Sequence, residues 1–347
     1  MPKKHIKILF VDFWDNFSPT DNLFVNLLSD AYDIEVSETP DYLFYSVFGQ
    51  KHLKYRDCVR IFYTGENQSP DFNVCDYAVG FDHITFMDRY HRFPLYVQFA
   101  GDYDDMMSKH ARTDGELLAG RDGFCSFVYS NNNASPERNR FYDLLCTYKP
   151  VASGGRFRNN VGGPVADKKE FQSHYRFSVA FENTSVPGYA TEKLVQAFAA
   201  GTVPVYWGDP LIDRTFNSKA FINCHDYDSF EDVLAAVRRI DQDESLYLAM
   251  LREPALIDMN DTREKRLEGL RSFLCHILDQ NPVSARRYSR EYWALRYYDN
   301  LEVRETVYRR SLRGIAESFY KKYFWRWRRS SRLMWKIDRF LKRLIGR

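Results

Sequence analysis

Two adjacent charged residues, Glu192 and Lys193, stand where a helix is expected to begin. Thr191 is a suitable N-cap, and Leu194 and Phe198 lie on one apolar face. The first turn of a helix offers unpaired backbone N–H groups and the positive end of the dipole, which attract phosphate. Lysine adds charge to such a site, and a carboxylate accepts hydrogen bonds from ribose hydroxyls. The pair predicts a nucleotide diphosphate site; the alternative is a solvated helix start.

Two arginines could also bind phosphate. Arg156 and Arg158 lie in the glycine-containing loop Gly154–Asn159. A guanidinium group stays charged and donates two parallel hydrogen bonds, which suits phosphate. The loop itself does not decide which of the two arginines would bind.

A third candidate is Glu66, in the run Thr64-Gly65-Glu66-Asn67 that follows the apolar segment Val59–Tyr63. If this segment is a strand, Glu66 stands at its carboxyl end, where an acid can face a cleft. A carboxylate within hydrogen-bond reach of a hydroxyl can remove its proton. The alternative is an acid that solvates a turn.

The elements that must position these residues alternate between strand and helix. Residues 177–210 predict a strand (Phe177–Phe181), a helix that stops at Gly201 and a second strand (Val203–Trp207). Parallel sheets of this kind bind ligands at the carboxyl ends of their strands. The first half predicts further strands at 6–14, 34–36, 42–48, 59–63 and 77–80, with a helix after Thr20 or Asp21. We therefore expect an α/β fold with two domains, residues 1–148 and 149–310.

Three separated blocks resemble the α-1,3/4-fucosyltransferases of glycosyltransferase family 10. The central block contains aromatic-Glu-Asn, Tyr-x-Thr-Glu-Lys and Gly-Thr-x-Pro-Val-Tyr-x-Gly within residues 177–210. The other two, FYTGENQSPDFN at 62–73 and DYAVGFD at 76–82 followed by DRYHRFPLY at 88–96, resemble the bacterial members. The blocks cover most of residues 60–210 in the family's order.

The resemblance implies a GT-B fold, in which two Rossmann-like domains face each other across a cleft. It implies transfer of L-fucose from GDP-β-L-fucose, with inversion, to the 3-hydroxyl of N-acetylglucosamine in a lactosamine-type glycan, giving Lewis x-like lipopolysaccharide. It assigns Glu66 as the base and Arg158, with Arg156 as runner-up, to the pyrophosphate. It also places Asn183 and Tyr189 in the donor pocket with Glu192 and Lys193. The open alternatives are α-1,4 or dual linkage, another nucleotide sugar, and a silent glycan or nucleotide binder.

The resemblance implies no cofactor and no essential metal, although two Asp-x-Asp pairs are possible metal ligands. Asp102 with Asp104, and Asp226 with Asp228, have the spacing with which another class of glycosyltransferases holds a divalent metal. Neither pair lies where family 10 has a metal site, and such pairs arise easily in a sequence rich in Asp and Tyr. Arg138, by contrast, could be either a structural ion-pair partner or a ligand residue.

Composition predicts a reducing compartment and shows that the carboxyl-terminal segment is strongly basic. The six cysteines form no CxxC pair, and no segment has the apolar length of a membrane span.

The net charge of +2 combines +12 in residues 309–347 with −10 in residues 1–308. Residues 311–347 predict a basic amphipathic tail. We expect it to attach the protein to the inner face of the cytoplasmic membrane; nucleic-acid binding and a docking helix are the alternatives. One heptad-like unit, Tyr297–Tyr308, precedes the tail.

Overall fold

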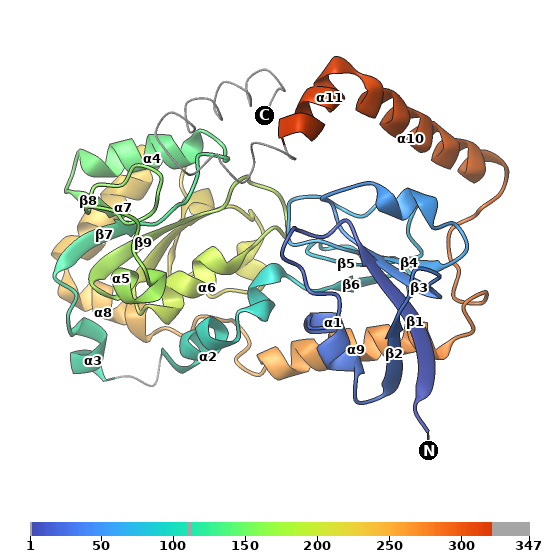
Figure 1. Ribbon diagram of the computed structural model, residues 1–347. Coiled ribbons are helices and arrows are strands. Elements are labelled where there is room, and N and C mark those ends of the chain that lie inside the picture. The colour runs from blue at the N-terminus through green and yellow to red at the C-terminus, as the bar shows by residue number, and fades with distance from the viewer. Residues whose placement is uncertain (1, 110–112, 321–347) are drawn as a thin grey trace.

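The structure is a computed structural model that describes residues 2–109 and 113–320. It has two lobes, each built around its own parallel sheet (Figure 1). The first sheet has six strands in the order β2-β1-β3-β4-β5-β6, and all neighbouring pairs are parallel. Its strands are β1 Lys4–Val11, β2 Tyr32–Val36, β3 Tyr42–Tyr45, β4 Val59–Tyr63, β5 Tyr77–Gly80 and β6 Tyr90–Arg92.

The second sheet has five strands in the order β11-β10-β9-β7-β8, again parallel throughout. Its strands are β7 Gly123–Phe127, β8 Val151–Ser153, β9 Tyr175–Phe181, β10 Val203–Trp207 and β11 Ile222–Asn223. Central strands such as β4, β9 and β10 are almost continuously buried, as expected when helices or loops cover both faces of a parallel sheet.

Helices cover the sheets and join the two lobes. The α-helices are α1 Leu23–Leu28, α2 Ala100–Ser108, α3 Asp114–Leu118, α4 Glu137–Cys146, α5 Lys168–Ser173, α6 Glu192–Ala199, α7 Phe230–Gln242, α8 Glu244–Arg252, α9 Arg263–Asp279, α10 Tyr292–Arg310 and α11 Leu312–Phe319. The 3-10 turns are η1 Lys51–Lys54, η2 Leu95–Gln98, η4 Ile212–Arg214 and η5 Cys224–Asp226. Helix α2, which follows the first sheet, packs against α6 of the second lobe.

The predicted strand-helix-strand unit is confirmed as β9-α6-β10. Thr191 is the N-cap of α6, with an extended backbone, and Gly201 follows the helix with a φ of +72°. A residue after a helix often takes this left-handed conformation, which glycine adopts without strain. The inward face of α6 is fully buried, so apolar packing fixes the position of its first turn.

The division between the sheets lies earlier in the chain than residue 148, where the sequence placed it. Strands β7 and β8 both belong to the second sheet, so the first sheet ends at Arg92 and the second begins at Gly123. Residues 123–148 therefore belong to the second lobe. The lysine-proline step at 149–150 precedes β8, an edge strand within that lobe, rather than a new domain.

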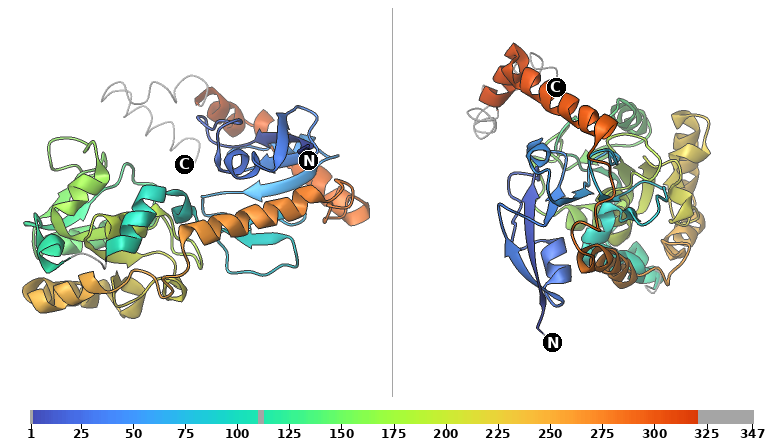
Figure 2. Two further views of the ribbon diagram at one scale, coloured as in Figure 1. Left: turned by 90° about the horizontal axis from the view of Figure 1, so that it is seen from below. Right: turned by 90° about the vertical axis from the view of Figure 1, so that its right-hand side faces the viewer.

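The chain also returns to the first lobe after α8. Helix α9 runs along the first lobe, as Figure 1 and the left view of Figure 2 show, and packs against α1. The Tyr32 hydroxyl donates to Asp279 at 2.7 Å. The segment between α8 and α9, which returns to the first lobe, contacts the segment that first leaves it. The Tyr103 hydroxyl donates to the Asp261 carbonyl at 2.8 Å, and Arg263 donates to the Val97 carbonyl at 2.9 Å. The predicted range 149–310 thus contains segments of both lobes.

Helix α10, which contains the heptad-like unit, lies on the first lobe (Figure 1). The buried Arg60 guanidinium donates to the Tyr298 hydroxyl at 2.5 Å, and Arg56 pairs with Asp299 and Glu302. Of the predicted tail, residues 311–320 are described and contain α11; residues 321–347 lie outside the described residues. Within the described ranges, no helix combines the length and apolarity needed to cross a bilayer.

Candidate active site

The carboxyl ends of the two sheets meet through two loops. One loop follows β4 and contains Glu66, which is exposed and whose backbone N–H donates to Thr64 Oγ1 at 3.0 Å. The other loop follows β9 and contains Asn183 and Tyr189. Asn67 Nδ2 in the first loop donates to Thr184 Oγ1 in the second at 2.5 Å. The predicted base is therefore next to the predicted donor loop.

Tyr189 is buried at this junction, with 3% of its surface exposed. Its ring makes an edge-on contact with Phe81, at the end of β5, with 5.2 Å between ring centroids. Burial raises the pKa of the Tyr189 hydroxyl, and the negative charges of Glu182 and Glu66 raise it further. Tyr189 is therefore a neutral hydroxyl that packs against the first lobe as well as the donor loop.

Gly188 allows the two lobes to approach closely. Its φ is +85°, and a Cβ at this position would lie 2.6 Å from the Phe81 carbonyl oxygen. Its N–H donates to Asp209 Oδ1 at 2.7 Å, and Asp209 Oδ2 lies 4.0 Å from His83 Nε2 of the first lobe. A side chain at residue 188 would push the donor loop away from the first lobe.

Glu182, to which the sequence reasoning gave no role, organises the start of α6. Its side chain is fully buried and accepts hydrogen bonds from the Thr191 N–H and hydroxyl, both at 2.7 Å, and from Lys193 Nζ at 2.9 Å. The signal was present in the aromatic-Glu-Asn motif, whose glutamate follows directly on a buried strand. Residue spacing alone does not show that this carboxylate points back toward the helix start.

Lys193 is largely buried, and its ammonium contacts more than one oxygen. Besides Glu182, Thr191 Oγ1 lies at 2.8 Å and Glu192 Oε1 at 3.7 Å. Burial would lower the pKa of Lys193, but Glu182 and Glu192 outweigh it and raise the pKa above its ordinary value. The charge expected of Lys193 is thus present, and Glu182 neutralises part of it.

Glu192 occupies the first turn of α6, as predicted. Burial would raise the pKa of its carboxyl group, but the positive charges of Lys193 and Lys168 reverse this effect and lower the pKa. Glu192 is therefore ionised at neutral pH. A carboxylate held this way can accept two hydrogen bonds from vicinal hydroxyls.

Arg138 positions Asn183. Its buried guanidinium lies over the Tyr129 ring, 4.2 Å from the centroid, and donates to the Asn131 carbonyl at 2.8 Å and to Asn183 Oδ1 at 3.3 Å. These contacts occupy two of its nitrogen atoms with protein acceptors. They favour the structural role among the two that the sequence left open, and they leave the Asn183 amide nitrogen able to donate.

Arg158 lies apart from this group. It pairs with Asp143 of α4, with one nitrogen–oxygen distance of 3.0 Å, and its guanidinium sits 4.8 Å from the centre of the Tyr142 ring. Asp143 raises the pKa of Arg158, so the group stays charged. The structure does not bring Arg158 together with Lys193, and the runner-up Arg156 is exposed.

The two Asp-x-Asp pairs have protein partners. Asp102 accepts a hydrogen bond from Gln196 at 3.0 Å, and Asp226 accepts one from Asn223 at 2.9 Å. Among residues 2–109 and 113–320, no three His, Cys, Asp or Glu side chains cluster as a metal site requires.

Two family models match separate parts of the chain. Residues 8–99 match the alpha-(1,3)-fucosyltransferase FucT N-terminal domain, and residues 118–294 match the carboxyl-terminal domain of glycosyltransferase family 10 (fucosyltransferase). The two matched ranges divide the chain between residues 99 and 118, where the sheets also divide it.

Curated relatives match over part of their length. An alpha-(1,3)-fucosyltransferase FucT of Helicobacter pylori is 38% identical over 265 residues, which cover 66% of this chain and 55% of that protein. An alpha-(1,4)-fucosyltransferase of Arabidopsis thaliana is 30% identical over 170 residues, 42% of each chain. The chain thus spans about half the length of these relatives.

Solved structures extend the likeness to the fold. A crystal structure of an alpha1,3-fucosyltransferase with GDP-fucose is 31% identical, with a TM-score of 0.65 over 79% of this chain and 91% of that one. Another alpha1,3-fucosyltransferase structure is 32% identical, with a TM-score of 0.69 over 84% and 93%. The expected GT-B arrangement is confirmed. The chain belongs to glycosyltransferase family 10, the fucosyltransferase family.

Proposed function

We propose that this chain is an inverting α-1,3-fucosyltransferase that moves L-fucose from GDP-β-L-fucose to the 3-hydroxyl of N-acetylglucosamine in a lactosamine-type glycan. The observation that carries the proposal is the Asn67–Thr184 hydrogen bond, which holds the loop of a candidate base against the donor loop of the family. The likeness to an alpha1,3-fucosyltransferase solved with GDP-fucose supports the choice of donor.

In the proposed reaction, the Glu66 carboxylate takes the proton of the acceptor hydroxyl. The acceptor oxygen forms a bond to the anomeric carbon of fucose while the bond from that carbon to the diphosphate breaks. The electron pair of the broken bond leaves with GDP. The configuration inverts because the acceptor oxygen attacks the face of the anomeric carbon opposite the leaving diphosphate. Glu66 suits this role because it is exposed and adjoins the donor loop.

The donor would bind at the start of α6. Lys193 and the first-turn N–H groups would stabilise the negative charge that grows on the leaving diphosphate. Glu192 would accept hydrogen bonds from ribose, and Asn183 and Tyr189 would contact the base or the sugar. Arg158 would join the diphosphate only by exchanging its Asp143 partner for a phosphate oxygen.

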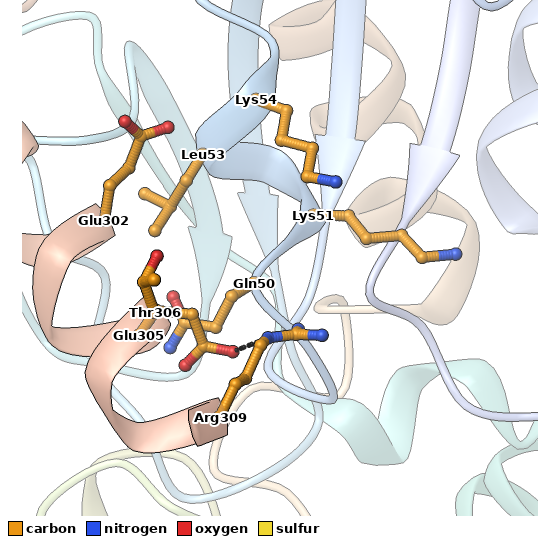
Figure 3. Close-up of a pocket in the computed structure, with 8 residues that line it drawn as sticks. All are labelled: Gln50, Lys51, Leu53, Lys54, Glu302, Glu305, Thr306 and Arg309. Atoms are coloured by element: carbon orange, nitrogen blue, oxygen red, sulfur yellow. Dashed lines mark hydrogen bonds and ion pairs between the residues drawn. The ribbon is translucent and has the colours of Figure 1, made fainter. Parts of the chain in front are cut away.

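The acceptor would bind on the first lobe, beside Glu66. Trp14 and Phe48, which follow β1 and β3, are 46% and 47% exposed. Their rings lie edge to face, with 6.4 Å between the ring centroids. Aromatic faces of this kind pack well against the apolar faces of sugars. Beyond Phe48, a groove of about 460 Å³ runs between η1 and α10, with Gln50 and Thr306 among its lining residues (Figure 3). Most of its lining residues have polar or charged ends on apolar stems, which suits the more distant units of a glycan, such as a lipopolysaccharide chain.

A donor competition assay and product analysis test this proposal. We expect transfer from GDP-fucose and none from GDP-mannose or UDP sugars. Linkage analysis on type 2 and type 1 lactosamine acceptors should give the α-1,3 product on type 2. An α-1,4 product would favour the alternative that the Arabidopsis relative represents. Tight GDP binding without transfer would contradict an enzymatic role.

We propose further that no divalent cation is required, because lysine supplies the charge at the start of α6. The test is activity after chelation. Loss of activity with EDTA and recovery with Mn²⁺ would contradict this part of the proposal, whereas an unchanged rate would support it.

We also propose that the protein acts in the cytoplasm, on the inner face of the cytoplasmic membrane, through its basic carboxyl-terminal segment. The support is the sequence of residues 309–347, which contains 14 Lys or Arg and only two acidic residues. Deletion of residues 321–347 should abolish co-sedimentation with anionic vesicles and leave transfer to a soluble acceptor unchanged. Equal sedimentation of the full chain and the truncated protein would contradict membrane attachment. If the full chain instead binds nucleic acid and the truncated protein does not, nucleic-acid binding would be favoured.

A further inference from the structure

A fourth charged side chain reaches the start of α6, besides Glu182, Glu192 and Lys193. Lys168, the first residue of α5, donates from Nζ to Gln196 Oε1 at 2.7 Å. Gln196 lies four residues after Glu192, and residues with this spacing share one face of a helix. The contact therefore brings the Lys168 amine to the face of α6 that carries Glu192.

The hydrogen-bond network fixes the position of this amine. Gln196 uses its other end to donate to Asp102 Oδ2 of α2 at 3.0 Å, so α5, α6 and α2 are joined through one amide. The next residue, Lys169, has different partners. Its Nζ lies 2.6 Å from Asp105 and 3.8 Å from Asp102. Two adjacent lysines thus direct their charge to different places.

The charged groups around Lys168 are mostly acidic and favour its protonated form. Burial lowers the pKa of Lys168 to about 8, and Glu192 is the charged neighbour that acts most strongly in the opposite direction. Lys193, Glu182 and Asp102 also face it. Lys193 is shared between the buried Glu182 and Glu192, so Lys168 is the second positive charge that offsets Glu192, after Lys193.

We propose that Lys168 is a positioning residue for the donor diphosphate: its positive charge adds to that of Lys193 in offsetting Glu192 and Glu182, so that the first turn of α6 can receive a nucleoside diphosphate. The inference rests on the proposed function, because it needs a diphosphate at this helix start. Deprotonation of Lys168 makes the net charge beside the site more negative by one unit. Lys193 and Tyr189 have pKa values raised beyond their ordinary values, so neither loses a proton between pH 7 and pH 9.

The consequence is a pH-dependent affinity for GDP. A bound diphosphate favours protonated Lys168, so affinity falls by a factor of about ten for each pH unit above the pKa of the free protein. For a pKa of about 8, the dissociation constant should rise about tenfold between pH 7 and pH 9.

The experiment is isothermal titration with GDP from pH 7 to pH 9, using the full chain. Four proteins are compared: wild type, K168R, K168M and the matched control K169M. K168R, whose charge does not titrate in this range, should lose the tenfold rise and also corrects for ionisation of GDP itself. K168M should bind GDP at least about tenfold more weakly than wild type at pH 7, and this difference should narrow as the pH rises to 9. K169M should follow wild type.

Two results would overturn the inference. If K168M and K168R keep the wild-type pH dependence, another group is responsible, while the proposed function is unaffected. If wild type binds no GDP at any pH, the proposed function fails and this inference fails with it. Thermal unfolding of each variant identifies any that does not fold, and K168R, which keeps the charge, then provides the comparison.

Discussion

Asn67 of the first lobe donates a 2.5 Å hydrogen bond to Thr184 of the second, and this bond joins the loop of Glu66 to the loop of Tyr189. If the bond aligns base and donor, removing either partner should lower kcat/KM by a few fold, and removing both should add little. We expect a coupling free energy of about 0.5–1.5 kcal/mol in a cycle of N67A, T184V and the double variant. Additive effects would contradict a direct role for this contact.

Glu66→Gln should lower kcat by a factor of at least about 100, because an amide cannot accept the acceptor's proton. Binding of GDP should be unchanged, since Glu66 belongs to the other lobe. Steady-state kinetics and GDP titration measure the two quantities. Near-normal turnover in a folded E66Q protein would remove Glu66 from the mechanism.

Glu182→Gln should destabilise the protein by about 3 kcal/mol or more, because it leaves the largely buried Lys193 without its principal partner. The measurement is the free energy of unfolding in urea. Glu170→Gln is the matched control: Glu170 is exposed and pairs only with exposed His174 among the ion pairs of the described chain, so its loss should change stability by less than about 0.5 kcal/mol. Equal effects of the two substitutions would contradict a structural role for Glu182.

Arg158→Ala and Asp143→Ala separate two roles for the same guanidinium. If Arg158 leaves Asp143 to bind the diphosphate, R158A should lower kcat by about tenfold or more, while D143A should retain or improve donor affinity. If the pair only anchors the loop after β8, both substitutions should lower stability similarly and leave kcat unchanged. Kinetics and thermal unfolding of both variants decide between these roles.

Asp88 anchors the returning segment through Arg287, at 2.6 Å, and through His276, at 3.1 Å. The hydrogen bond from Arg287 lowers the pKa of Asp88 to about 2, from an ordinary value of 3.8. A lowered carboxyl pKa contributes stability above the ordinary pKa, and this contribution disappears as the pH falls through the lowered value. The stability difference between wild type and D88N should therefore be constant above about pH 5 and shrink between pH 4 and pH 2.

Urea unfolding at several pH values measures this difference. Asp15→Asn, which removes an exposed carboxylate, is the control and should show little difference at any pH. A D88N effect that persists undiminished at pH 2 would mean that charge is not its source.

Local sequence predicted the local elements well, because capping, apolar periodicity and turn residues are read from neighbours. Thr191 is the N-cap of α6, Gly201 follows that helix, and β4 occupies Val59–Tyr63, all as expected. The boundary at 148 was misplaced because strand membership depends on pairing partners. Nothing within residues 123–127 indicates that they pair with β8 and β9 rather than with the first sheet.

The candidate site shows the same limit. The motif located Glu192, Lys193 and Tyr189, and the structure gathers their helix and loop at the junction of the lobes. Sequence could not show that Lys193 contacts Glu182, or that Arg158 contacts Asp143, because both pairings depend on side-chain direction across loops. Residues that act through a neighbour, such as Arg138, were for the same reason left unassigned.

The chain passes between the lobes twice, and the two passages are hydrogen-bonded to each other through Tyr103 and Arg263. Two adjoining connections permit rotation about the line that they share and resist twisting about any other axis. Opening of the lobes would therefore be a hinge rotation about one axis. Such a rotation would bring Glu66 back to the same position opposite α6 each time the lobes close.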